Sequence, residues 1–402
     1  MKEDWENWPI NQICQIRPPK DEVRSRLAAN DEVSFVPMEN LGIEQKRLDL
    51  KEVKMLSEVE GSYTYFADKD VLLAKITPCF ENGKLGIASN LVNGVGFGSS
   101  EYMVFRPDQR LSPDWLYYYL SRETFRLEGA QHMSGAVGHK RVNKDFVEHY
   151  LIPIPSPREQ ERLVGILDKA FADLAKAKAL AERNRQNAKG IFDSYLNTIF
   201  GLSNPEWVKS TIGKCIHFID YRGKTPIKTS TGLRLITAKN VKMGFLREEP
   251  KEYINPESYK SWMTRGIPEF GDVLFTTEAP LANIAQLDTD QKVAFAQRII
   301  IMQPNKLELD STFLKYLLLS QPIQKKIHSK GTGATVKGIK ASLLKTIEIS
   351  FPKAMDEQKQ IVAKLNDLLN DVRQLESNCS RKIQYLDELK QSLLHQAFTG
   401  QL

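Results

Sequence analysis

The chain has 402 residues, of which 41% are hydrophobic and 26% are charged. This balance is typical of globular proteins and leaves enough apolar material for more than one core. The formal net charge of +6 is compatible with a nucleic-acid partner but does not require one. Four scattered cysteines without a CxxC pair argue against a zinc site or a disulfide scaffold, and they predict a cytoplasmic protein with reduced thiols. The apolar runs are too short to cross a membrane, and the N-terminus does not resemble a signal peptide.

Residues 1–151 predict a globular α+β segment made mainly of short strands. The stretch 102–105 is rich in β-forming residues, and Asn-Gly pairs at 82–83 and 93–94 mark turns. Residues 115–126 predict one helix, with Pro113 close to its start. We therefore expect a twisted, irregular sheet with a helix beside it.

A long helix is predicted to follow, from residue 159 to residue 200. Three prolines precede it between residues 153 and 157, and Gly201 ends it. At 1.5 Å per residue such a helix would be about 60 Å long. Its apolar positions recur in alternating steps of four and three, which is the pattern of a coiled-coil seam. The seam positions are Leu163, Leu167, Ala170, Leu174, Ala177, Ala181, Asn184, Ala188, Ile191 and Tyr195.

The whole arrangement recurs 198 residues later. Gln160 near the start of the helix is matched by Gln358, and Phe200 near its end is matched by Phe398. Residues 202–349 repeat the blocks of the first segment in the same order, including one helix predicted over 313–328. A period this long indicates the duplication of a globular unit plus a helix, because solenoid repeats recur about every 20–50 residues. The second seam contains Ile361, Leu365, Leu368, Val372, Leu375, Cys379, Lys382, Leu386, Leu389 and Leu393.

One helix cannot bury its apolar stripe alone, so the two copies are expected to pack against each other. Because a globular segment separates them along the chain, we expect the pairing to be antiparallel. Asn184 and Lys382 fall at matching positions of the two seams. Two explanations stay open for them: a polar pair that fixes the register of the helices, or a tolerated, solvated defect.

Motifs of the common enzyme classes are missing from the sequence. Residues 223–225 resemble the end of a phosphate-binding loop, but Phe218 stands where such a loop needs glycine. The Asn-Pro pairs at 204–205 and 255–256 do not continue into the motif of amino-methyltransferases. The six histidines are dispersed, and no HExxH motif occurs. The sequence therefore predicts neither a catalytic site nor a metal site.

The start of each long helix resembles the conserved region of the specificity subunits of type I restriction-modification systems. Residues 152–155 (IPIP) lead into the pair Glu159-Gln160, and residues 351–352 lead into a second Glu-Gln pair with one extra residue between. The C-terminal stretch 396–402 (QAFTGQL) is also typical of that family. The resemblance covers the full chain and is carried mainly by the order and the duplication of these blocks.

The resemblance implies an α+β fold with a pseudo-twofold internal repeat. Two similar target recognition domains, at 1–151 and 202–349, would alternate with two antiparallel coiled-coil helices that serve as conserved spacers, at 152–201 and 350–402. Each domain would bind one half of a split double-stranded DNA sequence. The helices would set the spacing and dock two methyltransferase (M) subunits, which restriction (R) subunits then join. Such a chain catalyses nothing and needs no cofactor; the alternative is a non-catalytic, coiled-coil-linked duplicated protein that recognises protein or carbohydrate.

Polar loops with glycines recur in both halves and are the candidates for DNA contact. Lysine and arginine bind phosphates, and polar side chains read base edges. The alternative for each loop is a solvent-exposed structural turn. In the first half the candidates are Lys75, Thr77, Lys84, Ser134, His139, Lys140 and Arg141. In the second half they are Arg222, Lys224, Thr276, Thr277, Lys330, Thr332, Thr335 and Lys337.

Overall fold

The structure, a computed structural model, describes residues 5–136, 138–201, 204–221, 225–333 and 337–402. It divides into two compact units: unit 1 is Met1–Ala181 with Arg381–Leu402, and unit 2 is Glu182–Ser380. Each unit therefore contains one globular domain, the first half of one long helix and the second half of the other. The first and second domains are named below in chain order.

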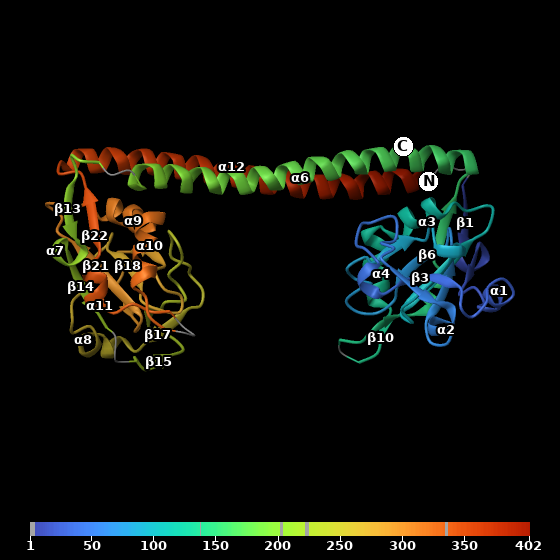
Figure 1. Cartoon of the computed structure of the whole chain (residues 1–402), viewed down its shortest axis with the longest axis horizontal. Helices are drawn as coiled ribbons and strands as arrows, with labels where there is room; N and C mark the ends of the chain where they lie inside the picture. Colours follow the sequence, from blue (N-terminus) through green and yellow to red (C-terminus); the bar gives the residue numbers. More distant parts are fainter. Residues whose placement is uncertain (1–4, 137, 202–203, 222–224, 334–336) are drawn as a thin grey trace. The chain divides into compact units, whose positions relative to one another are not determined.

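The first domain is built around two four-stranded sheets. One sheet has the order β2-β9-β6-β7 and the other has the order β4-β3-β8-β5, in which β3 and β8 pair in parallel. Figure 1 labels β6 of the first sheet and β3 of the second. The strands of the first sheet are β2 (Cys14–Ile16), β6 (Val71–Ala74), β7 (Leu85–Ile87) and β9 (Tyr102–Pro107). Those of the second are β3 (Glu32–Val36), β4 (Glu52–Met55), β5 (Thr64–Ala67) and β8 (Val95–Gly98). Strands β10 (Met133–Ser134) and β11 (Arg141–Val142) form a separate two-stranded hairpin.

Strand β6 shows why this domain contains an unbroken apolar run. Successive side chains of a strand point to opposite faces of the sheet. Val71 and Leu73 join the core that helix α3 (Pro113–Leu120) covers. Leu72 and Ala74 join a separate core on the opposite face. The central strand is thus buried on both faces, which requires apolar residues at every position.

Residues 113–131 form two helices, whereas the sequence predicted a single helix over 115–126. Helix α3 ends at Leu120, and α4 (Glu123–Gln131) begins after Arg122, whose ψ of 141° is extended. The other short helices of the first domain are α1 (Asp21–Arg24), α2 (Leu56–Val59) and α5 (Lys144–Glu148). The single-helix prediction was wrong because one extended residue is enough to start a new helix in another direction.

The same correction applies to the second domain, where one helix was predicted over 313–328. Helix α9 (Ser311–Leu319) is separated from α10 (Gln321–Lys330) by Ser320, whose ψ of 142° is extended. Pro322 lies in the first turn of α10, and proline does not fit a helix interior. This proline marked the break in the sequence. The remaining helices of this domain are α7 (Ile212–Cys215), α8 (Tyr259–Trp262) and α11 (Ala341–Lys345).

One sheet of the second domain repeats its counterpart in the first, whereas the other keeps three matching strands and has its fourth, β15, at the opposite edge. Their orders are β14-β21-β18-β19 and β15-β17-β16-β20. In β18, Val273 and Phe275 join the core under α9, whereas Leu274 joins the core on the opposite face. The first of these sheets contains β14 (Ile216–Asp220), β18 (Val273–Thr276), β19 (Ile284–Gln286) and β21 (Ile299–Pro304). The second contains β15 (Lys228–Thr229), β16 (Leu233–Ile236), β17 (Glu252–Ile254) and β20 (Ala294–Phe295).

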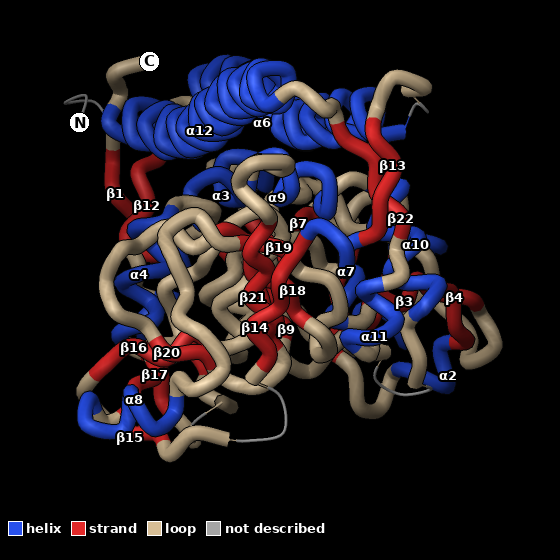
Figure 2. Tube along the Cα trace, turned by 90° about the vertical axis from the view of Figure 1, so that its left-hand side faces the viewer, coloured by secondary structure: helices blue, strands red, loops and turns tan. Residues whose placement is uncertain are grey.

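A two-stranded ladder leads from each domain into its long helix (Figure 2). In unit 1, β1 (Glu6–Pro9) pairs antiparallel with β12 (Leu151–Ile154), after which α6 (Pro157–Gly201) begins. In unit 2, β13 (Val208–Thr211) pairs antiparallel with β22 (Glu348–Phe351), after which α12 (Met355–Thr399) begins. Both helices contain 45 residues, slightly more than predicted.

Gln160 anchors the first turns of α6 to the first domain. Its side chain is buried, and Nε2 donates to the carbonyl oxygens of Arg110 (2.7 Å) and Pro155 (2.9 Å). Its Oε1 accepts a hydrogen bond from the amide of Ser112 (2.8 Å). A single side chain therefore ties the helix to the loop that precedes α3 and to the end of the ladder.

Gln358 makes the matching anchor in unit 2. It is buried, and its Nε2 donates to the carbonyl oxygens of Glu308 and Pro352, both at 2.8 Å. Its Oε1 accepts from the amide of Asp310 at 2.9 Å. The glutamine of each Glu-Gln pair is thus a joint between domain and helix, which gives this sequence signature a structural reason.

A second matched contact lies further along each helix. The hydroxyl of Tyr118 in α3 donates to the carboxylate of Asp168 in α6, and the hydroxyl of Tyr316 in α9 donates to Oδ1 of Asn366 in α12 at 2.6 Å. In unit 1, Lys46 also pairs with Asp168 at 2.6 Å. The joint between domain and helix was therefore duplicated together with the domain.

The two long helices pack against each other in antiparallel fashion within each unit. In unit 1, Arg162 near the start of α6 donates to the carbonyl of Leu402 (2.9 Å), and Lys178 further along pairs with Asp387 (2.7 Å). In unit 2, Leu196 and Leu365 share a buried cluster. These contacts show the antiparallel pairing that the order of the segments predicted.

Several residues that the heptad spacing places in the seam are exposed to solvent. Ile191, Tyr195 and Leu389, which the heptads place in the seam, are 49%, 38% and 47% exposed. A straight helix drifts by about 20° per heptad, so the buried stripe moves by nearly one residue over four heptads. Leu196 and Leu394 are buried in their place. Leu375, another predicted seam residue, is 42% exposed. Predicted seam residues that are buried or half-buried include Leu163, Leu167, Leu174, Ile361, Leu365, Val372 and Leu393.

Asn184 and Lys382 are both exposed. They therefore fit the solvated explanation and not a buried polar pair. The drift of the helix repeat again accounts for this, because both residues lie where a strict heptad and a straight helix have begun to diverge.

The end of a long helix completes the core of each domain. At the end of α12, Leu394 and Phe398 join the core of the first domain, where the rings of Phe398 and Trp115 lie 4.2 Å apart. At the end of α6, Phe200 packs against the core of the second domain, 5.3 Å from the ring of Phe313. The first domain therefore depends on residues from the far end of the chain.

Candidate nucleic-acid interface

The β10–β11 hairpin is docked beside the end of central strand β6 in the first domain. The amide of Thr77 donates to the carbonyl of Lys140, and the amide of Val142 donates to the carbonyl of Lys75, both at 2.9 Å. These bonds fix the base of the hairpin to the segment that follows β6. The returning strand of the hairpin is consequently held against the sheet.

The described residues on either side of the turn of this hairpin are exposed. Gly135 has a φ of 124° and Gly138 a φ of 83°, in a region of backbone space that favours glycine. The side chains of Ser134, His139 and Lys140 next to these turns are exposed. The two glycines thus allow a tight turn that presents polar and basic side chains to solvent.

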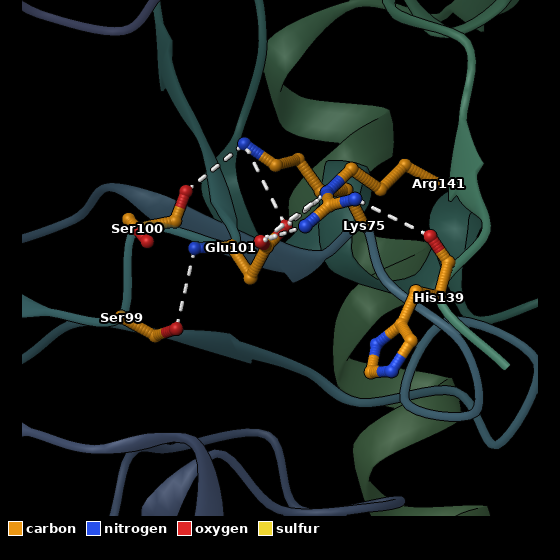
Figure 3. Close-up of polar contacts among 6 residues, drawn as sticks. All are labelled: Lys75, Ser99, Ser100, Glu101, His139 and Arg141. Carbon is orange, nitrogen blue, oxygen red and sulfur yellow. Dashed lines mark hydrogen bonds and ion pairs between the residues drawn. The ribbon is translucent and has the colours of Figure 1, made fainter. Parts of the chain in front are cut away.

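Three charged side chains meet at the base of the hairpin (Figure 3). The guanidinium of Arg141 donates twice to Glu101, from Nε to Oε2 at 2.9 Å and from Nη2 to Oε1 at 2.6 Å. Nη1 of Arg141 also donates to the carbonyl of His139 at 3.2 Å. Nζ of Lys75 donates to the carbonyl of Ser100 at 2.9 Å and lies 4.0 Å from Glu101. The ion pair therefore stiffens the returning strand of the hairpin.

Burial shapes the electrostatics of this cluster. The pKa of Lys75 is lowered, chiefly because burial disfavours its charged form; Glu101 opposes this shift, whereas Arg17 and Arg141 add to it. The pKa of Glu101 is lowered, first by its hydrogen bond with Arg141. The carboxylate is thus held in its charged form. An additional anion would stabilise the charged form of Lys75.

The second domain carries a hairpin at the same place. The amide of Ile339 donates to the carbonyl of Thr277 at 3.0 Å, as Val142 does to Lys75 in the first domain. Thr332 and Gly338 exchange two backbone hydrogen bonds, at 2.8 and 2.9 Å. Equivalent backbone bonds therefore dock a hairpin beside β6 and beside β18.

The predicted DNA-contact residues divide into an exposed set and a set held within the fold. The exposed residues on the two hairpins are Ser134, His139, Lys140, Arg141, Thr332 and Lys337. In contrast, Thr276 and Thr277 are buried, and the hydroxyl of Thr276 donates to the carbonyl of Pro280 at 2.7 Å. Arg222, Lys224 and Thr335 lie outside the described residues.

Three further candidates use their polar groups within the fold. Nζ of Lys84 donates to the carbonyl of Met38 at 2.6 Å. Nζ of Lys330 donates to the hydroxyl of Thr346 at 2.6 Å. The hydroxyl of Thr77 donates to Glu81 at 3.0 Å. These contacts brace the loops around the hairpins, which is a structural role.

Two basic residues that the sequence did not single out complete the surface of the first domain. Arg17 and Lys144 line a cavity of about 140 Å³ together with Lys75 and Arg141. Arg17 follows edge strand β2, and Lys144 begins α5. Their separation in the sequence gave no signal, because only the sheet and the hairpin bring them together.

The long helices expose large apolar side chains. Ile191 of α6 and Leu389 of α12 are about equally exposed and occupy equivalent positions of the repeat. Each helix therefore presents apolar side chains to solvent at equivalent positions of the repeat. Exposed large apolar residues on the two helices are Ile166, Leu180, Ile191, Tyr195, Leu375, Tyr385 and Leu389.

Metal-binding clusters, cysteines and membrane-spanning helices also bear on what the described part of the chain could do. It contains no group of three or more His, Cys, Asp or Glu side chains that could hold a metal ion. Its four cysteines are free thiols. None of its helices is both long and apolar enough to cross a membrane.

Comparison with known proteins gives the family. The model of the type I restriction modification DNA specificity domain matches residues 2–182 and 206–385. The specificity subunits of the type I restriction enzymes EcoEI and EcoAI from Escherichia coli are 39% and 35% identical, over 42% and 41% of this chain. The chain spans little more than a quarter of the length of these relatives, 28% and 27%. The MjaVIII specificity subunit of Methanocaldococcus jannaschii is 23% identical over 76% of this chain and 74% of that protein.

Two solved structures share the fold. One comes from work on complex assembly and conformational transition of the type I R-M system. The match covers 100% of this chain and 99% of the other chain, with a TM-score of 0.82 and 18% identity. The other is the HsdS subunit from Thermoanaerobacter tengcongensis, which covers 100% and 98%, with a TM-score of 0.67 and 16% identity. The family domain occurs twice and spans most of the chain. The chain therefore belongs to the type I restriction-modification DNA specificity family.

Proposed function

We propose that this chain selects the DNA site of a type I restriction-modification complex, and that each domain binds one half of a split double-stranded sequence. The observation that carries this proposal is the duplicated hairpin, docked by equivalent backbone bonds beside β6 and β18. A two-stranded β-ribbon fits the major groove of B-DNA, where base edges are distinguishable. Two rigidly mounted polar hairpins in one chain thus suit two separate half-sites.

Within each half-site the exposed hairpin residues are the proposed contacts. Ser134 and His139 offer hydrogen-bonding groups at the tip of the first hairpin, and Lys140 offers a cation for a phosphate. Thr332 and Lys337 take these roles in the second domain. The buried Thr276 and Thr277 are left out of the proposed surface.

We also propose that the long helices set the gap between the half-sites and dock two M subunits, to which R subunits are added. The glutamine joints support a fixed gap, because Gln160 and Gln358 each bind their helix to a domain through three hydrogen bonds. The exposed Ile191 and Leu389 support docking. Because they are repeated, they suit two copies of one partner.

The test is to co-express the chain with its cognate M subunit and to map methylated adenines across a host genome that lacks other methyltransferases. We expect a split motif with one methylated base in each half. A host that expresses the M subunit alone provides the control. An unsplit motif, or no methylation from a stable complex, would contradict the proposal.

A further inference from the structure

The cavity beside the first hairpin holds an excess of positive charge. Arg17, Lys75, Arg141 and Lys144 line it, and buried Tyr102 forms part of its wall. Two carboxylates oppose these four cations. Glu101 pairs with Arg141, and Glu148 pairs with Lys144 at 3.0 Å.

Arg17 is the one cation of the four that makes no ion pair with any residue that the structure describes. Its backbone is held by a hydrogen bond from its amide to the carbonyl of Val104 at 3.0 Å, with a φ of 56°. Arg17 is exposed and is one of the residues that line the cavity. Arg17 is also close enough to Lys75 to disfavour the charged form of that lysine.

The second domain carries none of these four cations at the equivalent positions. The pairs Ile16–Phe105 and Phe218–Met302 occupy the same register, so Ile219 replaces Arg17. Ile219 is buried. The first residue of α11 is Ala341, where α5 begins with Lys144.

The other two positions are also neutral in the second domain. The amide of Thr277 donates to the carbonyl of Arg298 as Lys75 does to Glu101, so Thr277 replaces Lys75 and Arg298 replaces Glu101. The bridge Ile76–Arg141 corresponds to Glu278–Gly338, so Gly338 replaces Arg141. The set of four cations is therefore particular to the first domain. In the second domain Arg298 occupies the position of Glu101 and pairs with Glu278 at 2.9 Å.

We propose that this recess grips one backbone phosphate of the half-site bound by the first domain, and that the second domain holds its half-site without an equivalent grip. This proposal rests on the proposed function and adds an asymmetry to it. The volume of about 140 Å³ is that of roughly four to five waters, enough for one phosphate group with part of its hydration. The excess of two positive charges attracts an anionic phosphate, and the guanidinium of Arg17 can donate to two of its oxygens.

The recess also lies in the right place for such a contact. Arg141 borders it and at the same time fixes the hairpin through Glu101 and the carbonyl of His139. A phosphate held there would set the position of the hairpin tip along the groove. Phosphate contacts position a protein on DNA, and base contacts supply its specificity.

The experiment uses the complex with M subunits and duplexes that carry the split motif. Affinity is measured against salt concentration for wild type, Arg17→Gln, Lys144→Gln and the charge-preserving Arg17→Lys. Each Gln variant should weaken binding roughly 5- to 10-fold and flatten the slope of log K against log salt by about 0.9, the value for one lost phosphate contact. Arg17→Lys should retain the slope. The matched control in the second domain is exposed Lys340→Gln, next to Ala341, which should change neither quantity.

Neutral methylphosphonate linkages then locate the phosphate. One position, in the half-site of the first domain, should weaken wild-type binding but leave Arg17→Gln binding unchanged. No position in the other half-site should behave in this way. If every neutral linkage weakens both proteins equally, or if the slopes are unchanged, the recess does not bind a phosphate. If wild type itself shows no preference for the split motif, the proposed function fails instead.

Discussion

Gln160→Ala tests whether a single side chain joins the first domain to its helix. The substitution removes three hydrogen bonds and leaves the amide of Ser112 and the carbonyls of Arg110 and Pro155 without their partner. A buried polar group left unsatisfied costs about 1–3 kcal/mol. Because water can reach exposed Arg110, we expect a total loss of about 3 kcal/mol rather than the full sum. For a unit of this size that corresponds to a fall in Tm of about 6–12 °C.

The assay combines thermal unfolding with hydrogen exchange read by mass spectrometry. Amides of residues 108–114 should exchange faster in the variant, whereas those of 306–312 should not. Gln358→Ala should give the reverse pattern, and Gln374→Ala, at an exposed position of α12, should change neither segment. An unchanged Tm, or equal loosening of both segments by Gln160→Ala, would refute the anchoring role.

Three further perturbations address the helices. Phe398→Ala should destabilise unit 1 by about 3–5 kcal/mol, because it empties a buried site beside Trp115; an equal effect on unit 2 by hydrogen exchange would contradict the assignment of α12 to the first core. Burial, aided by Arg373, lowers the pKa of Lys315 from 10.5 to about 8. The free energy of unfolding of unit 2 should therefore rise as pH increases from about 8 to 10.5. Lys315→Met should abolish this rise, whereas Lys325→Met, at an exposed position, should not. Denaturant titrations across this pH range measure the effect. Inserting four residues after residue 181 and four after residue 379 lengthens each long helix by about 6 Å. Methylation mapping should then show a gap between the half-sites that is longer by about two base pairs. An unchanged gap would contradict the proposal that the helices set the spacing.

The duplication was visible in the sequence because it rests on matched blocks in a fixed order. Gln160 and Gln358 stood out as part of a signature, but their function as joints was not predictable. Each of them bonds to a loop about 50 residues upstream. Only the folded domain brings that loop to the helix. The same limit applies to Phe398, whose place in the first core depends on the two ends of the chain meeting.

Errors in the helix predictions had two physical causes. The heptad spacing placed Ile191 and Leu389 in the seam, but both are exposed. Each lies more than four heptads from the start of its helix, where a straight helix has rotated away from a strict heptad repeat. The break at Ser320 was signalled by Pro322, whereas the equivalent break at Arg122 carried no such mark.

The candidate interface was only partly predictable. The glycine-bearing loops were singled out because Gly135 and Gly138 stand among polar residues in the sequence, but their hairpin form was not predicted. Arg17 and Lys144 were missed because they follow a β-strand and begin a short helix, far apart along the chain. Conversely, Thr276 and Thr277 matched a polar pattern but are buried by the sheet. Exposure and proximity are tertiary properties, and the local sequence does not determine them.

The most direct test of two independent readers is to exchange residues 1–151 for the target recognition domain of another family member and to map adenine methylation by the resulting complex. The account predicts that one half-site changes, while the other half-site and the gap stay the same. A motif changed in both halves, or unchanged in both, would contradict the claim that each domain reads its own half of the site.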